Sequence, residues 1–261
     1  HGVGLTTAAS VPRALFAAGA PQRLNEARIA DGLMRNLSDD EATSFDGVQQ
    51  VPTGSIVELI LARAPQLRRW YDLMNIPVRD VTDDRAVIAR AGELLDEGIR
   101  ACMAGFKKPG STISAGLDSP QVAIRALAAL PPNQKLPTFT FHPEPGFDGF
   151  VPRRMMGDER PMVERLARRY ARLDPHFTCN SGYEHDHRCR ELFHLTGTPS
   201  GLSTMYVFHG LLSEASKMGC DVLLLAEWGN LTFSDRGEAG FVEYFLDGNW
   251  RQLWLGLSHL P

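Results

Sequence analysis

The sequence predicts an α/β fold in which a mostly parallel sheet is flanked by helices. Short apolar segments of strand length alternate with segments of helical periodicity from about residue 83 to residue 230. Alternation of this kind builds a parallel sheet with helices on both faces, and ligands then bind at the carboxyl ends of the strands. The chain has 261 residues, of which 43% are hydrophobic. This length and composition provide a core for one or two domains.

The boundaries of the expected elements follow from caps and stop signals. Thr82-Asp83-Asp84 can cap a helix that runs to about Gly105, because side-chain oxygens accept from the free N–H groups of a first turn. Gly219 is the stop signal of a later helix. We expect helices over residues 83–105, 121–130, 158–170 and 202–217, and strands over residues 111–113, 136–142 and 221–226.

The run Ser114-Ala115-Gly116-Leu117-Asp118-Ser119 lies between the first strand and a helix that starts near Pro120. Gly116 lets the backbone approach a phosphate closely, and Pro120 is tolerated at a helix start. The Ser114 and Ser119 hydroxyls can bond phosphate oxygens, and Asp118 can hold Mg²⁺. The run therefore predicts a pyrophosphate-binding loop, with a plain structural turn as the alternative.

Two segments together resemble the asparagine synthetase family of ATP-pyrophosphatase (PP-loop) enzymes. The family's loop Ser-Gly-Gly-x-Asp-Ser is matched at residues 114–119, except that Ala115 replaces the first glycine. The family's later segment after a buried strand is matched by Ala226-Glu227-Trp228-Gly229-Asn230. There Asn230 stands where the family has an aspartate that binds magnesium, so the ion would depend more on Asp118 and on the triphosphate.

The resemblance implies ATP and Mg²⁺ as cofactors and assigns the site residues. Glu227 and Asp118 are the expected catalytic residues, with Glu227 close to the reacting carbonyl. The metal ligands are Asp118 and Asn230, and Asp235 is a further candidate. The nucleotide-binding residues are Ser114, Ala115, Gly116, Leu117, Asp118, Ser119, Phe141, Ala226 and Gly229. Phe141 has two readings, an adenine-packing residue or an ordinary core residue that alternates with Phe139.

Within the asparagine synthetase family, the chain most resembles the branch that closes lasso peptides into macrolactams. Both the string from Gly229 to Ser234 and Asp158-Glu159-Arg160-Pro161 are similar to segments of that branch. The implied reaction activates a peptide carboxylate as an acyl-adenylate, with release of pyrophosphate, and the amine of the same peptide then displaces AMP. Implied partners are a peptide or small-molecule carboxylate, a leader-peptide-binding protein and a protease. The alternatives are an asparagine or β-lactam synthetase and a non-catalytic nucleotide-binding relative.

We expect three parts in the chain. Residues 1–63 resemble the closing part of an amidotransferase-like (Ntn hydrolase-type) domain, with Pro52-Thr53-Gly54 as a turn between two short strands. Residues 64–82 are the expected connector, and residues 83–261 the synthetase domain, which we expect to be truncated at its C-terminus. Members of the family use a lysine from a later part of the chain to support attack by the amine, and no lysine follows Lys217 in this sequence. No glutaminase activity is expected, since no cysteine nucleophile lies near His1.

Cysteine spacing and net charge limit the cellular location, metal sites and partners that the sequence predicts. The four cysteines have no Cys-x-x-Cys spacing, which predicts reduced thiols and a cytoplasmic location. A zinc site is the alternative for the group listed here: Cys179, Cys189, His185, His187 and His194. The formal net charge of −4 argues against a nucleic-acid partner. No apolar run reaches the length of a membrane span.

Overall fold

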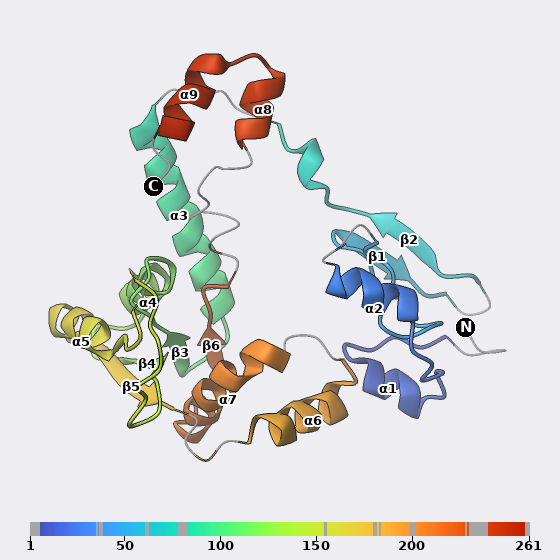
Figure 1. The fold of residues 1–261 in the computed structure, drawn as a ribbon, viewed down its shortest axis with the longest axis horizontal. Helices are drawn as coiled ribbons and strands as arrows, with labels where there is room; N and C mark the ends of the chain where they lie inside the picture. The colour runs from blue at the N-terminus through green and yellow to red at the C-terminus, as the bar shows by residue number, and fades with distance from the viewer. Residues whose placement is uncertain are drawn as a thin grey trace. The chain divides into compact units, whose positions relative to one another are not determined.

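The computed structural model describes most of the chain as two compact units. The described residues are 6–34, 36, 39–60, 63–77, 83–153, 156–179, 182, 184–198, 202–227, 229 and 240–258, without the side chains of 185 and 202–206. Unit 1 comprises residues 1–81 and 182–206, and unit 2 comprises residues 82–181 and 207–261. Figure 1 shows the elements of both units along the chain. The expected division after residues 63 and 82 stays a prediction.

Unit 1 is built from short elements. Its members are α1 (Pro12–Ala17), α2 (Glu26–Leu33), β1 (Ser55–Glu58), β2 (Gln66–Arg69), the 3-10 helix η1 (Leu73–Asn75) and α6 (His185–Thr196). The strands β1 and β2 pair antiparallel, with Ser55 opposite Arg69. The Pro52–Gly54 turn precedes β1 and does not link β1 to its partner, which differs from the expectation. The partner of β1 is β2, which lies inside the expected connector. Gly54 has φ +70°, and a Cβ there would collide with the carbonyl of Tyr71.

Unit 2 contains a four-stranded parallel sheet, which confirms the predicted fold class. Its strands are β3 (Pro109–Thr112), β4 (Leu136–Phe141), β5 (Leu173–Thr178) and β6 (Val222–Leu224). The strand order is β5-β4-β3-β6, and every neighbouring pair is parallel. Residues 136–140 of β4 are all buried, as expected for an inner strand of a sheet covered on both faces.

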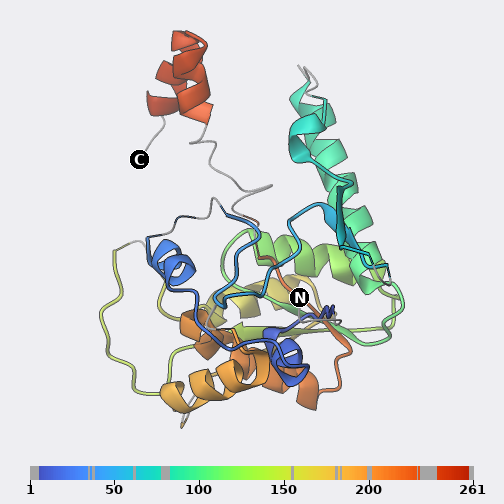
Figure 2. The same cartoon turned by 90° about the vertical axis from the view of Figure 1, so that its right-hand side faces the viewer.

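Helices cover both faces of this sheet, because alternate residues of a strand point to opposite faces. On one face, Leu136 of β4 packs with residues of α3 (Asp84–Met103), α4 (Asp118–Ala129) and α5 (Arg160–Arg169). On the other face, Phe139 of β4 packs with Leu211 and Ala215 of α7 (Leu202–Lys217). Figure 2 shows α4, in green, and α7, in orange-brown, on opposite sides of the strands. Unit 2 also includes α8 (Gly240–Leu246) and α9 (Trp250–Ser258), which contact each other.

Local signals explain where the helices of unit 2 begin and end. The Asp83 carboxylate accepts from the backbone N–H of Arg85 at 2.9 Å, as expected for the cap of α3. Gly105, just after the end of α3, has φ +88°. The helix α4 begins at Asp118, earlier than the expected start near Pro120. The N–H groups of a first turn have no partner within the helix, so Pro120 removes no helical hydrogen bond there.

Other elements of the fold were not predicted from the sequence. The strand β5 reads Leu-Asp-Pro-His-Phe-Thr, and its proline and polar residues obscure the apolar run of a buried strand. The helices α1, α2, α8 and α9 were also not expected. Within the described ranges, no helix is both long enough and apolar enough to cross a membrane.

Gly110 of β3 lies where the packing of α7 against the sheet leaves no room for a side chain. A Cβ at this position would lie 2.9 Å from Cε2 of Phe139 and 3.1 Å from Sγ of Cys220. We predict that Gly110→Ala lowers the free energy of unfolding by about 1–3 kcal/mol, the usual range for overpacking a core. Urea unfolding measures this change.

Gly98→Ala is the matched control for this substitution. Gly98 lies in α3, and no heavy atom comes within 4 Å of a Cβ built there. Alanine at this position should stabilise the protein by up to about 1 kcal/mol through helix propensity. An unchanged stability of Gly110→Ala would contradict the packing described for Phe139.

Candidate active site

The strand order places a switch point between β3 and β6. From β3 the chain adds β4 and then β5 on one side, and it later returns to the other side of β3 as β6. The carboxyl ends of parallel strands lie at one edge of a sheet, and a crevice opens where the order reverses. The segments after β3 and after β6, which contain the two predicted motifs, both leave the sheet at this point.

A close contact between Asp118 and Gly229 joins the two motifs. A Cβ on Gly229 would lie 2.5 Å from Oδ2 and 2.8 Å from Cγ of Asp118. Gly229 is buried and Asp118 is half-buried. The side chain of Asp118 therefore lies against the backbone of Gly229, and only glycine allows this approach.

Hydrogen bonds inside the loop after β3 set its shape. The Ser119 hydroxyl accepts from the backbone N–H of Ser114 at 2.8 Å and bonds the Ser114 hydroxyl at 2.8 Å. The Ser114 hydroxyl in turn accepts from the backbone N–H of Gly116 at 3.2 Å. A Cβ on Gly116 would lie 3.3 Å from that same hydroxyl oxygen. The two serines thus tie the start of α4 to the end of β3.

The entry to the loop is also held by the neighbouring strand. The N–H of Ile113 donates to the carbonyl of Phe139 at 3.0 Å. The buried hydroxyl of Thr140 donates to the carbonyl of Ile113 at 2.9 Å. Ile113 is therefore bonded to β4 through both of its backbone groups, immediately before the loop begins.

The other predicted site residues lie in different surroundings. Leu117 is 82% exposed and precedes the first residue of α4. Phe141, the last residue of β4, packs against the cluster of Phe139, Leu211 and Ala215. Ala226 packs against the cluster on the opposite face of the sheet, whereas Glu227 is exposed. Trp228, Asn230 and Asp235 lie outside the described residues, so their predicted roles stay predictions.

The residues at the switch point fit a magnesium-bound triphosphate in their chemistry. Asp118 lies in the first turn of α4, where the helix end favours anions and the carboxylate supplies the hard oxygen that Mg²⁺ prefers. The hydroxyl of Ser114, in the loop, lies 2.8 Å from the hydroxyl of Ser119, in the first turn of α4. Within the described ranges, no group of three or more His, Cys, Asp or Glu side chains could hold a metal ion.

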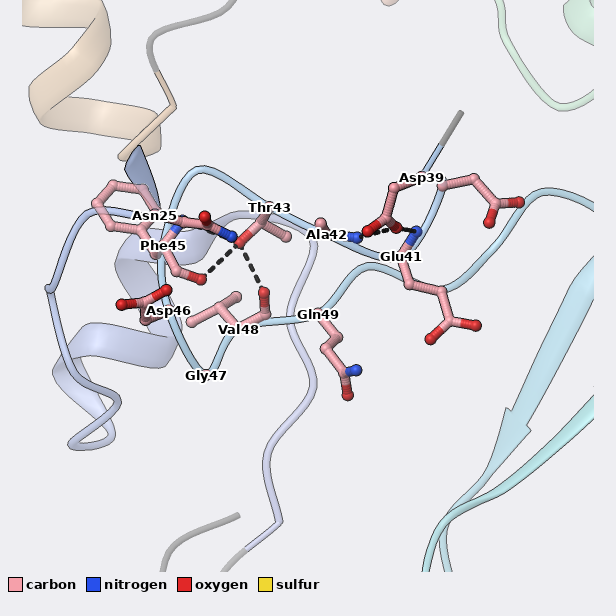
Figure 3. A pocket seen from close by; sticks show the side chains of 11 residues that line it. Asn25, Asp39, Glu41, Ala42, Thr43, Phe45, Asp46, Gly47, Val48 and Gln49 are labelled. Atoms are coloured by element: carbon pink, nitrogen blue, oxygen red, sulfur yellow. Dashed lines mark hydrogen bonds between the residues drawn. The ribbon is translucent and has the colours of Figure 1, made fainter. Parts of the chain in front are cut away.

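A separate hollow lies in unit 1 and contains none of the predicted site residues. It has a volume of about 470 Å³ and is lined by residues 25, 39–43 and 45–49. Figure 3 shows its hydrogen bonds: Asp39 accepts from the N–H groups of Glu41 and Ala42, both at 2.9 Å, and Thr43 donates to the carbonyl of Val48 at 2.6 Å. The N–H of Ala42 is the main cause that lowers the pKa of Asp39. These hydrogen bonds all join groups within the segment of residues 39–48 itself.

Unit 2 is thus an α/β domain whose parallel sheet has a switch point between β3 and β6. The family model described as asparagine synthase matches residues 90–245, which is more than half of the chain. The chain therefore belongs to the asparagine synthase family. This membership indicates ATP-dependent amide bond formation through an adenylate, with ATP generally used together with Mg²⁺. No curated protein matches the chain.

Glu159 is a residue at this edge of the sheet for which sequence reasoning assigned no role. It was noted only as part of Asp158-Glu159-Arg160-Pro161. In the structure it is half-buried at the start of α5, and loss of solvent raises the pKa of its carboxyl group. The available signal was an acidic residue at the start of a helix that follows the neighbouring strand.

We predict that Gly229→Ala weakens binding of magnesium-ATP by at least about tenfold, which corresponds to about 1.4 kcal/mol. The new Cβ would displace the Asp118 carboxylate from the contact described above. Titration calorimetry measures the affinity, and circular dichroism checks that the variant is folded. Gly32→Ala in α2 is the control, since a Cβ there meets no heavy atom within 4 Å. Equal affinities of the three proteins would contradict a nucleotide site at this contact.

Proposed function

We propose that the protein is an ATP-dependent amide ligase that closes a macrolactam ring in a ribosomally made peptide of the lasso type. Family membership supports the coarser part, ATP-dependent amide formation. The observation that carries the proposal is the contact of Asp118 with Gly229 at the switch point. This contact brings together the loop after β3, which we propose binds pyrophosphate, and the segment after β6, which we propose lies beside the reacting carbonyl.

In the proposed reaction, an oxygen of a peptide carboxylate attacks the α-phosphorus of ATP. The bond from that phosphorus to the bridging oxygen breaks, and pyrophosphate leaves with the electron pair. The N-terminal amine of the same peptide then attacks the carbonyl carbon of the acyl-adenylate. AMP leaves, the nitrogen loses a proton, and an amide bond has formed.

The roles of this chain's residues follow from where charge develops. Negative charge builds on the leaving pyrophosphate, so fixed donors of the loop and the start of α4 are the main source of stabilisation. Asp118, together with Asn230 and with Asp235 as a further candidate, would hold magnesium, which neutralises that charge when it is bound. Glu227, exposed beyond β6, is proposed to lie beside the reacting carbonyl.

The choice of a peptide substrate rests on the sequence. Gly229-Asn230-Leu231-Thr232-Phe233-Ser234 and Asp158-Glu159-Arg160-Pro161 are similar to segments of lasso peptide cyclases. A leader-peptide-binding protein and a protease are the partners that such a substrate implies. Asparagine or β-lactam synthesis would instead use a small carboxylate, and Trp228 and Asn230 disfavour those branches.

The proposal is tested by incubating the protein with magnesium-ATP and candidate precursor peptides. We predict AMP and pyrophosphate together with a peptide product that is lighter by one water molecule. Asp118→Asn should reduce pyrophosphate release by at least about a hundredfold, since charge neutralisation by a metal contributes several kcal/mol. Asp84→Asn, at the exposed start of α3, is the matched control and should keep the rate.

Three other results would redirect the proposal. Pyrophosphate with aspartate but with no peptide would favour asparagine synthesis. Pyrophosphate with another small carboxylate, whose product has lost water, would favour a β-lactam-type reaction. No pyrophosphate above the Asp118→Asn background, with any carboxylate, would favour a non-catalytic relative.

A further inference from the structure

Thr178 lies at the carboxyl end of the sheet, beside Phe141. These two residues end β5 and β4 and are direct partners in the register of the two parallel strands. Two residues earlier, His176 and Phe139 are also partners, and the centroids of their rings lie 5.7 Å apart. Because side chains two residues apart on a strand share a face, Thr178 and Phe141 lie side by side on the face that α7 covers.

The hydroxyl oxygen of Thr178 is buried and has no hydrogen-bond partner within the part of the chain that the structure describes. Nε of Arg125 and Nε2 of His176 are also buried there without a hydrogen bond. The side chain of Arg125, however, bonds Asp96 through Nη1 at 2.7 Å. Nε2 of His176 lies 3.3 Å from Oδ2 of Asp174. Thr178 differs from both, because its hydroxyl is its only polar side-chain group.

A buried hydroxyl without a partner costs free energy, because folding removes its water and supplies no hydrogen bond in return. Such groups are rare in native proteins. Thr178 as a whole is half-buried, and rotation about its Cα–Cβ bond moves the hydroxyl between staggered positions. A ligand at the ends of the strands can therefore supply the missing partner.

The position of Thr178 suits the base of a nucleotide whose phosphates bind the loop after β3. The strand order β5-β4-β3 puts the ends of β3 and β5 two strand spacings apart, which is about 10 Å. A nucleotide that extends from the loop toward β5 therefore crosses the end of β4, where the half-buried Phe141 lies. Phe141 offers an apolar surface for a base, and Thr178 offers a polar group beside it.

We propose that Thr178 is a binding residue for ATP: its hydroxyl makes a hydrogen bond with the edge of the adenine ring, which lies against Phe141. This role rests on the proposed function for the identity of the ligand. A hydroxyl can accept from the amino group of adenine or donate to a ring nitrogen. The same hydroxyl therefore lowers the stability of the free protein and strengthens binding of the nucleotide.

The first test measures thermal unfolding of the full chain without a ligand. Thr178→Val removes the unpaired hydroxyl and nearly keeps the shape of the side chain, so we predict that Tm rises by about 2–4 °C. Thr140→Val is the contrast, because the buried hydroxyl of Thr140 donates to the carbonyl of Ile113 at 2.9 Å and its loss should lower Tm. A lower Tm of Thr178→Val would overturn the inference, since the hydroxyl would then have a partner in the free protein.

The second test compares magnesium-ATP with magnesium tripolyphosphate, which has the three phosphates but no nucleoside. Calorimetry should show that Thr178→Val binds ATP about tenfold more weakly, equivalent to about 1.4 kcal/mol, and binds tripolyphosphate as the wild type does. Thr178→Ser keeps the hydroxyl and should bind ATP within about threefold of the wild type. Thr138→Val is the control and should change neither affinity, since Thr138 is buried on the face of β4 opposite to Phe141.

Failure of this inference can be told apart from failure of the proposed function. If the wild type and Thr178→Val bind ATP equally well, only the role of Thr178 is overturned. If Thr178→Val binds ATP and tripolyphosphate more weakly to the same extent, the hydroxyl acts on the phosphate loop and the inference is again overturned. If the wild type binds neither ligand, both the inference and the proposed function are overturned. A higher Tm together with weaker binding of ATP alone is the result that a merely structural role would not give.

Discussion

The site depends on the close approach of the Asp118 side chain to the backbone of Gly229. This approach is possible because β3 and β6 are parallel neighbours and end at the same edge of the sheet. Gly110 lies in β3 of the same sheet, and because it has no side chain it leaves room for Phe139 and Cys220. Gly229 thus sets how closely the two segments of the site can meet, and Gly110 sets how closely Phe139 and Cys220 can pack against β3.

The loop after β3 is ordered by its own groups and by its neighbours. Ser114 and Ser119 bond each other, and Ile113 is held by both backbone and side-chain groups of β4. The serine hydroxyls, which the sequence assigned to phosphate, also act inside the loop. A loop whose shape is held by hydrogen bonds within the protein has a smaller cost of ordering when it binds an anion, which favours stabilisation of a leaving pyrophosphate.

Much of the fold followed from local patterns in the sequence. The cap at Asp83 and the glycines after α3 and α7 predicted the ends of those helices closely. Buried strands with apolar or β-branched residues, such as β4, were also predicted well. The strand β5 was missed, because Pro175 and its polar neighbours do not resemble a buried strand. Its pairing with β4 throughout its length compensates for this weak local preference.

The sequence by itself determined the α/β class, the loop at residues 114–119 and the segment after β6, because these features are written in short-range periodicity and in adjacent residues. Only the tertiary structure decided that Gly229 lies against Asp118 and that Gly110 makes room for Phe139. Each of these contacts joins residues far apart in the chain. They depend on strand order and on which helix starts meet at one edge, and pairing between distant strands is specified by packing of the whole sheet rather than by any single segment.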